Sequence, residues 1–132
     1  MGFLRLVMAA AIAAILLGCD SAPIKAIQQE FKNLFQPKGE ADLASGIKQY
    51  EDGNYSAAAR LLQSSLDQGL GRNDQVRAHK YLAFIHCVSG RERRCRDEFR
   101  AALKIDPSFE LAANEAGHPI WGPAFRSAKG EQ

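Results

Sequence analysis

The chain has 132 residues, of which 46% are hydrophobic and 24% are charged, so it is long enough for one small globular domain. Its 17 lysines and arginines nearly balance 15 acidic residues, which gives a formal net charge of +2. A charge so close to neutral argues against nucleic acid as a partner and gives no general reason to expect an anionic surface.

Residues 1–18 have the pattern of an export signal. Arg5 precedes an uninterrupted run of apolar or small residues from Leu6 to Leu17, which is too short to span a bilayer stably. The sequence Leu16-Leu17-Gly18-Cys19 then resembles the lipobox of bacterial lipoproteins, in which the signal is cleaved before a cysteine that becomes acylated. The alternative is an ordinary signal peptide, or an anchor helix, with a chance cysteine.

The lipobox resemblance implies that Cys19 carries diacylglycerol and an N-acyl chain, with no other cofactor. Each buried CH₂ group contributes about 0.8 kcal/mol, so two or three acyl chains hold a soluble domain on a membrane almost irreversibly. The protein would then be anchored by lipid in the bacterial cell envelope and face the periplasm. Asp20 favours the inner membrane in enteric bacteria alone, so both the inner and the outer membrane stay open.

Residues 19–40 are predicted to link the anchor to the folded domain through a short amphipathic helix. Apolar residues recur at helical spacing, at Ile24, Ile27, Phe31, Leu34 and Phe35. Pro37 and Gly39 would end this helix. It could lie on the bilayer beside the lipid or pack against protein, and its mixed rather than basic polar face favours protein.

Residues 41–107 are predicted to form two helical hairpins. The stretch from Val76 to Val88 is apolar nearly all round, so a helix there must be covered on more than one face. A turn at Gly90 and a second amphipathic helix follow, and Asp106-Pro107 ends it. Residues 43–66 repeat this layout about 37 positions upstream, and the matched pairs are Gly46 with Ala83, Gly53 with Gly90, Ala58 with Cys95, Leu62 with Phe99, and Leu66 with Leu103.

This pattern resembles the tetratricopeptide (TPR) repeat, a helical hairpin of 34 residues. The small residues, Phe99 and Pro107 match the TPR signature, whereas His79 and His86 occupy the places of its Trp and Tyr. The resemblance implies an all-α fold of about two TPR-like units with helices capping both ends.

Residues 108–132 are predicted to cap the second unit. A helix is expected from Phe109 to Ala116, ended by His118-Pro119, and a last short helix is expected from about Pro123 to Ala128. Trp121 and Phe125 bring much apolar area, so we expect them in the core rather than on a ligand.

Cys87 and Cys95 are predicted to face each other across the second hairpin. In an oxidising compartment they would form a disulfide that closes about nine residues and stabilises the fold by about 2.5 kcal/mol. Two buried free thiols are the alternative. A metal site with His79 and His86 is disfavoured, because the two histidines lie about 10 Å apart along one helix.

A run of arginines, Arg91, Arg93, Arg94, Arg96 and Arg100, alternates with Glu92, Asp97 and Glu98. This run fits the solvated face of a helix, with local ion pairs worth a few tenths of a kcal/mol each. It could also dock a phosphate or an acidic partner.

No catalytic motif stands out, so we do not expect an enzyme or a small-molecule substrate. The TPR resemblance implies instead a concave peptide-binding groove, lined by Leu43, Ile47, Tyr50, Arg77, Lys80, Phe84 and Val88. Its two cations would suit a peptide with an acidic side chain or a terminal carboxylate. The alternative is that two units leave no groove and that Phe84 is buried by residues 108–132.

A closer resemblance spans residues 80–126, through the motifs K-Y-L-A-F-I-H-C, G-R-x₃-C-R-x₂-F, I-D-P-S-F-E-L and G-H-P-x-W-G-P-x-F. With the lipobox, these motifs are similar to the TPR-containing lipoproteins that accompany bacterial type VI secretion systems. That resemblance implies an accessory or scaffolding subunit whose partners are proteins of a secretion complex. A periplasmic chaperone or pilotin for another envelope complex is the main alternative; a regulatory subunit of a cell-wall enzyme and a thiol oxidoreductase are weaker ones.

Overall fold

A computed structural model describes residues 22–35 and 38–130, and the chain divides into two units, Met1–Gln36 and Pro37–Gln132. The described part of the first unit is one helix, α2 (Ala22–Phe35), where the sequence predicts an amphipathic helix. Four of its large apolar side chains are exposed, by 59% for Ile24, 64% for Ile27, 63% for Phe31 and 78% for Leu34. This helix therefore presents an apolar stripe.

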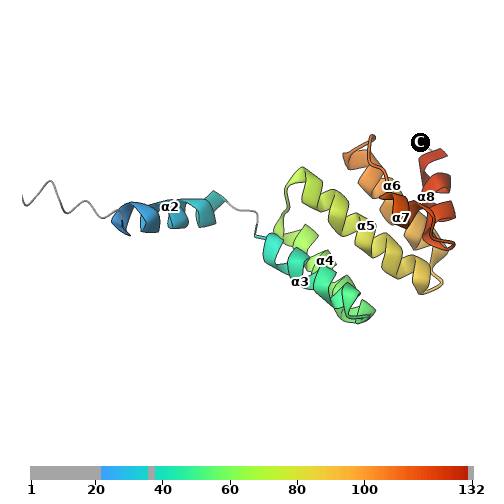
Figure 1. Cartoon of the computed structure of the whole chain (residues 1–132), viewed down its shortest axis with the longest axis horizontal. Coiled ribbons are helices and arrows are strands. Elements are labelled where there is room, and N and C mark those ends of the chain that lie inside the picture. Colours follow the sequence, from blue (N-terminus) through green and yellow to red (C-terminus); the bar gives the residue numbers. More distant parts are fainter. Residues whose placement is uncertain (1–21, 36–37, 131–132) are drawn as a thin grey trace, which may run out of the picture. The chain divides into compact units, whose positions relative to one another are not determined.

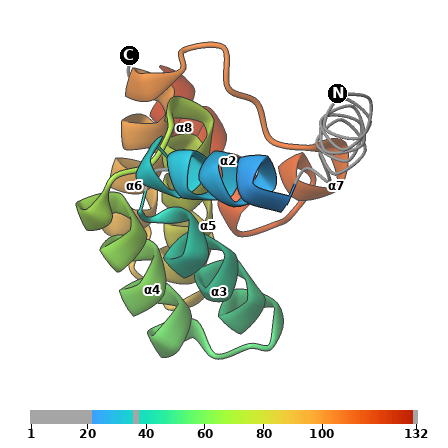
Figure 2. The same ribbon diagram turned by 90° about the vertical axis from the view of Figure 1, so that its left-hand side faces the viewer.

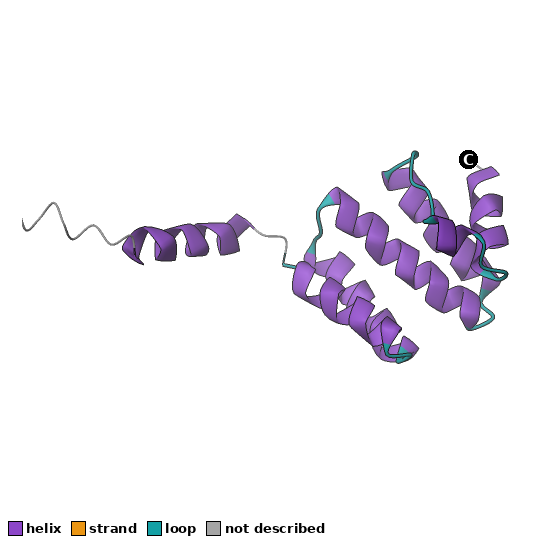
Figure 3. Cartoon of the chain, in the orientation of Figure 1, coloured by secondary structure: helices purple, strands orange, loops and turns teal. Residues whose placement is uncertain are grey.

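The second unit is built from helices α3 (Glu40–Glu51), α4 (Tyr55–Gln68), α5 (Arg72–Val88), α6 (Glu92–Ile105), α7 (Ala113–Ala116) and α8 (Trp121–Gly130). Within the described residues all regular structure is helical, which confirms the all-α prediction (Figure 3). Figures 1 and 2 show α5 between the first hairpin, formed by α3 and α4, and the helices α6 and α8.

The two hairpins turn in the same way, about 37 residues apart. Gly53 and Gly90 have φ angles of 79° and 71°, a left-handed conformation that glycine adopts without a Cβ clash. A matching backbone bond closes each turn, from Asn54 N–H to the Gln49 carbonyl (2.8 Å) and from Arg91 N–H to the His86 carbonyl (2.9 Å). The repeat seen in the sequence is therefore a repeat of local backbone structure.

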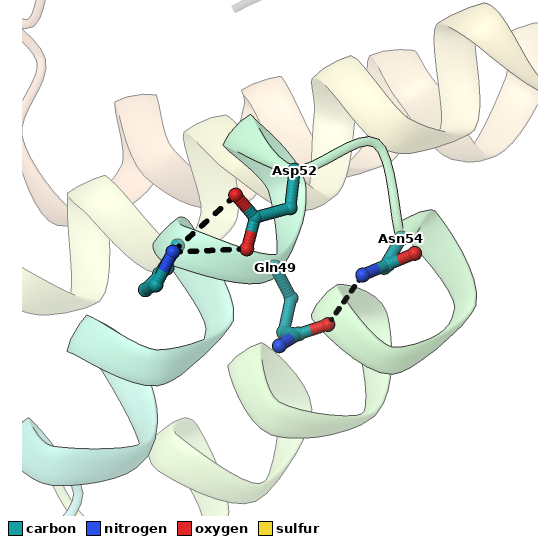
Figure 4. A network of polar contacts seen from close by, with 4 residues as sticks. Gln49, Asp52 and Asn54 are labelled. Carbon is teal, nitrogen blue, oxygen red and sulfur yellow. Dashed lines mark hydrogen bonds and ion pairs between the residues drawn. The ribbon is translucent and has the colours of Figure 1, made fainter.

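The side chains that hold the two turns differ. In the first hairpin the Asn54 amide also donates to Gln49 Oε1 (2.9 Å), as Figure 4 shows. Lys48 pairs with Asp52 (3.0 Å) beside it. In the second hairpin a disulfide joins Cys87 to Cys95, whose Cα atoms are 5.1 Å apart. The second hairpin is thus covalently closed where the first has surface hydrogen bonds.

Helix α5 contributes to two hydrophobic clusters. One cluster joins it to the first hairpin, through Leu43, Ala58, Leu62, Leu70, Ala78, Leu82 and Ile85. The other joins it to α6 and the C-terminal segment, through Ala83, Phe84, Cys87, Cys95, Phe99, Leu103, Leu111, Phe125 and Ala128. This double burial explains why α5 is apolar on almost every side.

Close packing within the first hairpin depends on a glycine. A Cβ atom on Gly46 would lie only 2.9 Å from Leu62 Cγ, so α3 and α4 approach more closely than any larger residue would permit. The small residue predicted at this position is therefore required by the distance between the helices.

The C-terminal segment begins its helix later than predicted. Residues 109–112 are not helical, because Leu111 (8% exposed) and Phe109 both reach the core, where the Phe109 and Phe125 rings meet edge to face at 5.5 Å. Helix α7 then starts at Ala113, and the Glu115 carboxylate accepts the Ala112 N–H (3.0 Å) at its start. The prediction of a helix from Phe109 was wrong, since the core contacts of Phe109 and Leu111 override the helical pattern.

Candidate functional site

The residues predicted to line a peptide groove do not all reach a surface. Leu43 and Phe84 are each only 2% exposed and belong to the two core clusters. Ile47, Tyr50, Lys80 and Val88 are half-buried, and Arg77 is exposed with a bond to Asp74 (3.0 Å). A peptide could not contact Leu43 or Phe84 unless the core opened.

The C-terminal segment covers the α5 part of the predicted groove. Lys80 Nζ lies 2.7 Å from Glu115 Oε1, and both side chains are less than one-fifth exposed, at 16% and 19%. The Trp121 ring stacks on Phe84 with centroids 4.4 Å apart, and its indole N–H donates to the Glu115 carbonyl (3.0 Å). The acidic group expected from a bound peptide is therefore supplied by the chain itself.

An aromatic group remains partly accessible beside this covered face. Tyr50 lies 5.6 Å from Tyr55 and 5.1 Å from Tyr81, measured between ring centroids, and Tyr55 is 39% exposed. Burial, with smaller effects of Tyr55, Tyr81 and Glu115, raises the pKa of Tyr50 to about 12. Tyr50 thus keeps its proton at physiological pH and serves as packing with a neutral hydroxyl.

The raised pKa of Tyr50 predicts a stability loss in alkali. The folded state holds this proton more tightly than the unfolded state, whose tyrosine pKa is near 10.0, so the contribution is complete below pH 10 and disappears as pH rises towards 12. Absorbance titration of phenolate should show a late component from Tyr50. Tyr50→Phe should remove that component and Tyr55→Phe should keep it; the reverse result would contradict the assignment.

Four residues were considered for a metal site, His79, His86, Cys87 and Cys95, and the described residues do not form a ligand cluster from them. His79 Nδ1 contacts Glu98 Oε2 (2.7 Å), whereas His86 Nδ1 is buried and has no hydrogen-bond partner among the described residues. Burial, and then the nearby Arg91, lowers the pKa of His86. Both sulfur atoms are in the disulfide, and no cluster of three potential metal ligands occurs in the described parts of the chain.

A second concave surface lies between the α5–α6 turn and the start of α8. This distal groove has a volume of about 460 Å³, and its wall includes Glu92, Arg96, Pro119, Ile120, Pro123 and Ala124. A neighbouring hollow has a volume of about 500 Å³. Three arginines border it, and we call them the basic rim: Arg91, Arg93 and Arg94. In the sequence, the arginine run and the prolines Pro119 and Pro123 are separate features, and no pattern indicates that Arg96 lines the same surface as these prolines.

Two predictions on the N-terminal part stay open. The export signal at residues 1–18 and the lipidation of Cys19 both lie outside the described residues, so they remain predictions. Among the helices that are described, none is long and apolar enough to cross a membrane.

No protein-family model, curated protein or solved structure matches this chain.

Proposed function

We propose that this protein is an exported lipoprotein that acts as a scaffold for other proteins and catalyses no reaction. The observation that carries the proposal is the pair of hairpins whose turns repeat the same glycine conformation and backbone bonds about 37 residues apart. Stacked helical hairpins of this kind, which we interpret as TPR-like units over residues 41–107, present extended surfaces to partners.

The disulfide supports an exported location. Cys87 and Cys95 are 4% and 0% exposed, so their bond is a buried structural link. Structural disulfides persist in oxidising compartments such as the periplasm and are rare in the cytosol. Together with the apolar run from Leu6 to Leu17 and Cys19, this bond favours a periplasm-facing protein held to a membrane by acyl chains.

The partners we propose are proteins of a type VI secretion complex. The residues that resemble type VI lipoproteins, 80–126, include Phe84, Phe99, Trp121 and Phe125, which pack together in one cluster. Residues from separate motifs therefore pack together in one part of the fold. A scaffolding role in that complex requires neither a cofactor nor a small-molecule substrate.

Lipidation tests the first half of the proposal. Cells of a Gram-negative host that express the chain are labelled with an alkyne fatty acid, and the protein is purified and detected by its label. The wild-type chain should carry label, and Cys19→Ser should carry none and accumulate as the uncleaved precursor. Equal labelling of both, or no labelling of the wild type, would contradict lipid anchoring.

Crosslinking in cells tests the second half. A photoreactive amino acid placed at Tyr55, which is exposed, should capture secretion-complex proteins in a strain that carries a type VI system. The same amino acid at Phe99, which is 0% exposed, serves as a negative control. Recovery of cell-wall enzymes alone at Tyr55 would reject the secretion role.

A further inference from the structure

We propose that the distal groove and its basic rim dock a segment of a partner protein in which a large apolar side chain is flanked by acidic residues. The inference rests on the proposed scaffold function and adds to it the surface and the chemistry of the partner. It differs from the groove implied by the TPR resemblance, whose α5 part is covered by the chain's own Glu115 and Trp121.

The groove has one apolar wall. Pro119, Ile120, Pro123 and Ala124 come from the α7–α8 turn and the start of α8, and the Ile120 side chain is 49% exposed. An exposed large apolar residue beside a concave surface loses unfavourable contact with water when a ligand covers it. The distal groove has a volume of about 460 Å³, which falls in the range of sites that bind small ligands, so it can hold a single side chain with its flanking backbone.

The neighbouring hollow, which shares Gly90, Glu92 and Arg96 with the groove, has an excess of positive charge. The acidic side chains of α6 are already engaged, Glu92 with Arg96 (3.9 Å), Asp97 with Arg100 (2.6 Å) and Glu98 with His79 (2.7 Å). Arg91, Arg93 and Arg94 are exposed and form no ion pair within the described residues. Guanidinium groups pair with carboxylates through two parallel hydrogen bonds, so this rim selects acidic side chains.

The position of these arginines is unfavourable for the helix itself. Helix α6 begins at Glu92, and Arg91, Arg93 and Arg94 lie at its N-terminal end, where the helix dipole disfavours cations. Arg91 and Arg94 also contribute to the lowered pKa of His86, after burial. A bound acidic segment would relieve this accumulated positive charge.

A protein segment fits this surface better than a bilayer does. The groove is concave, so a flat lipid surface would leave its floor uncovered, whereas an inserted side chain can fill it. The groove also lies at the C-terminal end of α5, about 25 Å along this 17-residue helix from its start. The chain enters the unit at the other end, where Gly39 N–H donates to the Gly69 carbonyl (3.1 Å), just before α5.

Peptide selection tests the inference with the full chain purified in detergent micelles. A displayed library of random dodecapeptides should yield binders that carry several acidic residues around one large apolar residue. Fluorescence anisotropy of a selected peptide should show affinity that falls as salt is raised. Enrichment of neutral or basic peptides, or no enrichment, would overturn the proposal.

Three variants locate the binding. Arg93→Glu with Arg94→Glu should weaken the selected peptide roughly tenfold or more, and Ile120→Ser should weaken it by roughly threefold to tenfold. A matched charge change at exposed cations elsewhere, Arg60→Glu with Lys104→Glu, should alter affinity by less than about twofold. Equal effects of the two charge-reversed pairs, or none from the rim pair, would reject this site.

The result can be separated from the proposed function. Suppose that no peptide is enriched, that the wild type prefers vesicles containing phosphatidylglycerol, and that the variant Arg93→Glu with Arg94→Glu loses this preference. The arginines would then bind lipid, and the inference would be overturned. If no peptide is enriched while Cys19 is lipidated and Tyr55 crosslinks to secretion proteins, only the proposed docking surface is rejected. If peptides bind at the rim but Cys19 carries no lipid, the anchored-scaffold proposal fails and the groove stands.

Discussion

Replacing Phe84 with alanine should lower the free energy of unfolding by about 3–5 kcal/mol, the usual loss when a fully packed aromatic side chain is removed. Phe84 is 2% exposed, and its ring meets those of Trp121 (4.4 Å), Phe99 (6.1 Å), Tyr81 (5.9 Å) and Tyr50 (6.2 Å) between centroids. The substitution removes one ring from all these contacts at once and leaves a cavity where the α5 face meets the C-terminal segment. Urea unfolding followed by circular dichroism measures the loss.

The same variant distinguishes a core residue from a groove residue. If Phe84 bound a peptide instead of packing in the core, it would not be needed for stability. Phe84→Ala would then bind the peptide weakly and keep the wild-type free energy of unfolding. Tyr55→Ala, at the exposed edge of the same aromatic group, is the matched control and should cost less than about 1 kcal/mol. A loss below about 1 kcal/mol for Phe84→Ala as well would return Phe84 to the groove.

The hairpins could be predicted because their signals are local. The apolar pattern on all sides of α5, the turn glycines and the small residue at Gly46 each constrain residues close in the sequence, and all three agree with the structure. The disulfide was predictable for the same reason, since Cys87 and Cys95 flank one short turn.

The sequence left open whether Phe84 lines a groove or is buried by residues 108–132, because the answer depends on pairs that are distant in the sequence. Lys80 meets Glu115 from 35 positions away, and Phe84 meets Trp121 across a similar separation. Helical periodicity assigns Phe84 to a face of α5 but does not say which later segment covers that face. The distal groove was not predicted, since Ile120 and Arg96 line one surface only after the C-terminal segment has turned back.

Reduction of the disulfide should lower the free energy of unfolding by about 2.5 kcal/mol, since a loop of about nine residues is released in the unfolded chain. The folded state should change little, because Cys87 and Cys95 stay buried among Phe99 and other apolar residues. Urea unfolding with and without dithiothreitol, at equal protein concentration, measures the difference. A wild-type curve that does not move with reductant would contradict a disulfide.

Alanine substitution separates the crosslink from the packing of its sulfur atoms. Ala58 already occupies the place of Cys95 in the first hairpin, whose turn is held by the Asn54 and Gln49 side chains, so a hairpin of this kind folds without a crosslink. Cys87→Ala with Cys95→Ala should therefore keep its helix content and lose at least as much stability as reduction does, because two buried sulfur atoms are removed as well. Dithiothreitol should have no further effect on this variant. If the variant lost its helices instead, the disulfide would be needed to form the second hairpin rather than only to stabilise it.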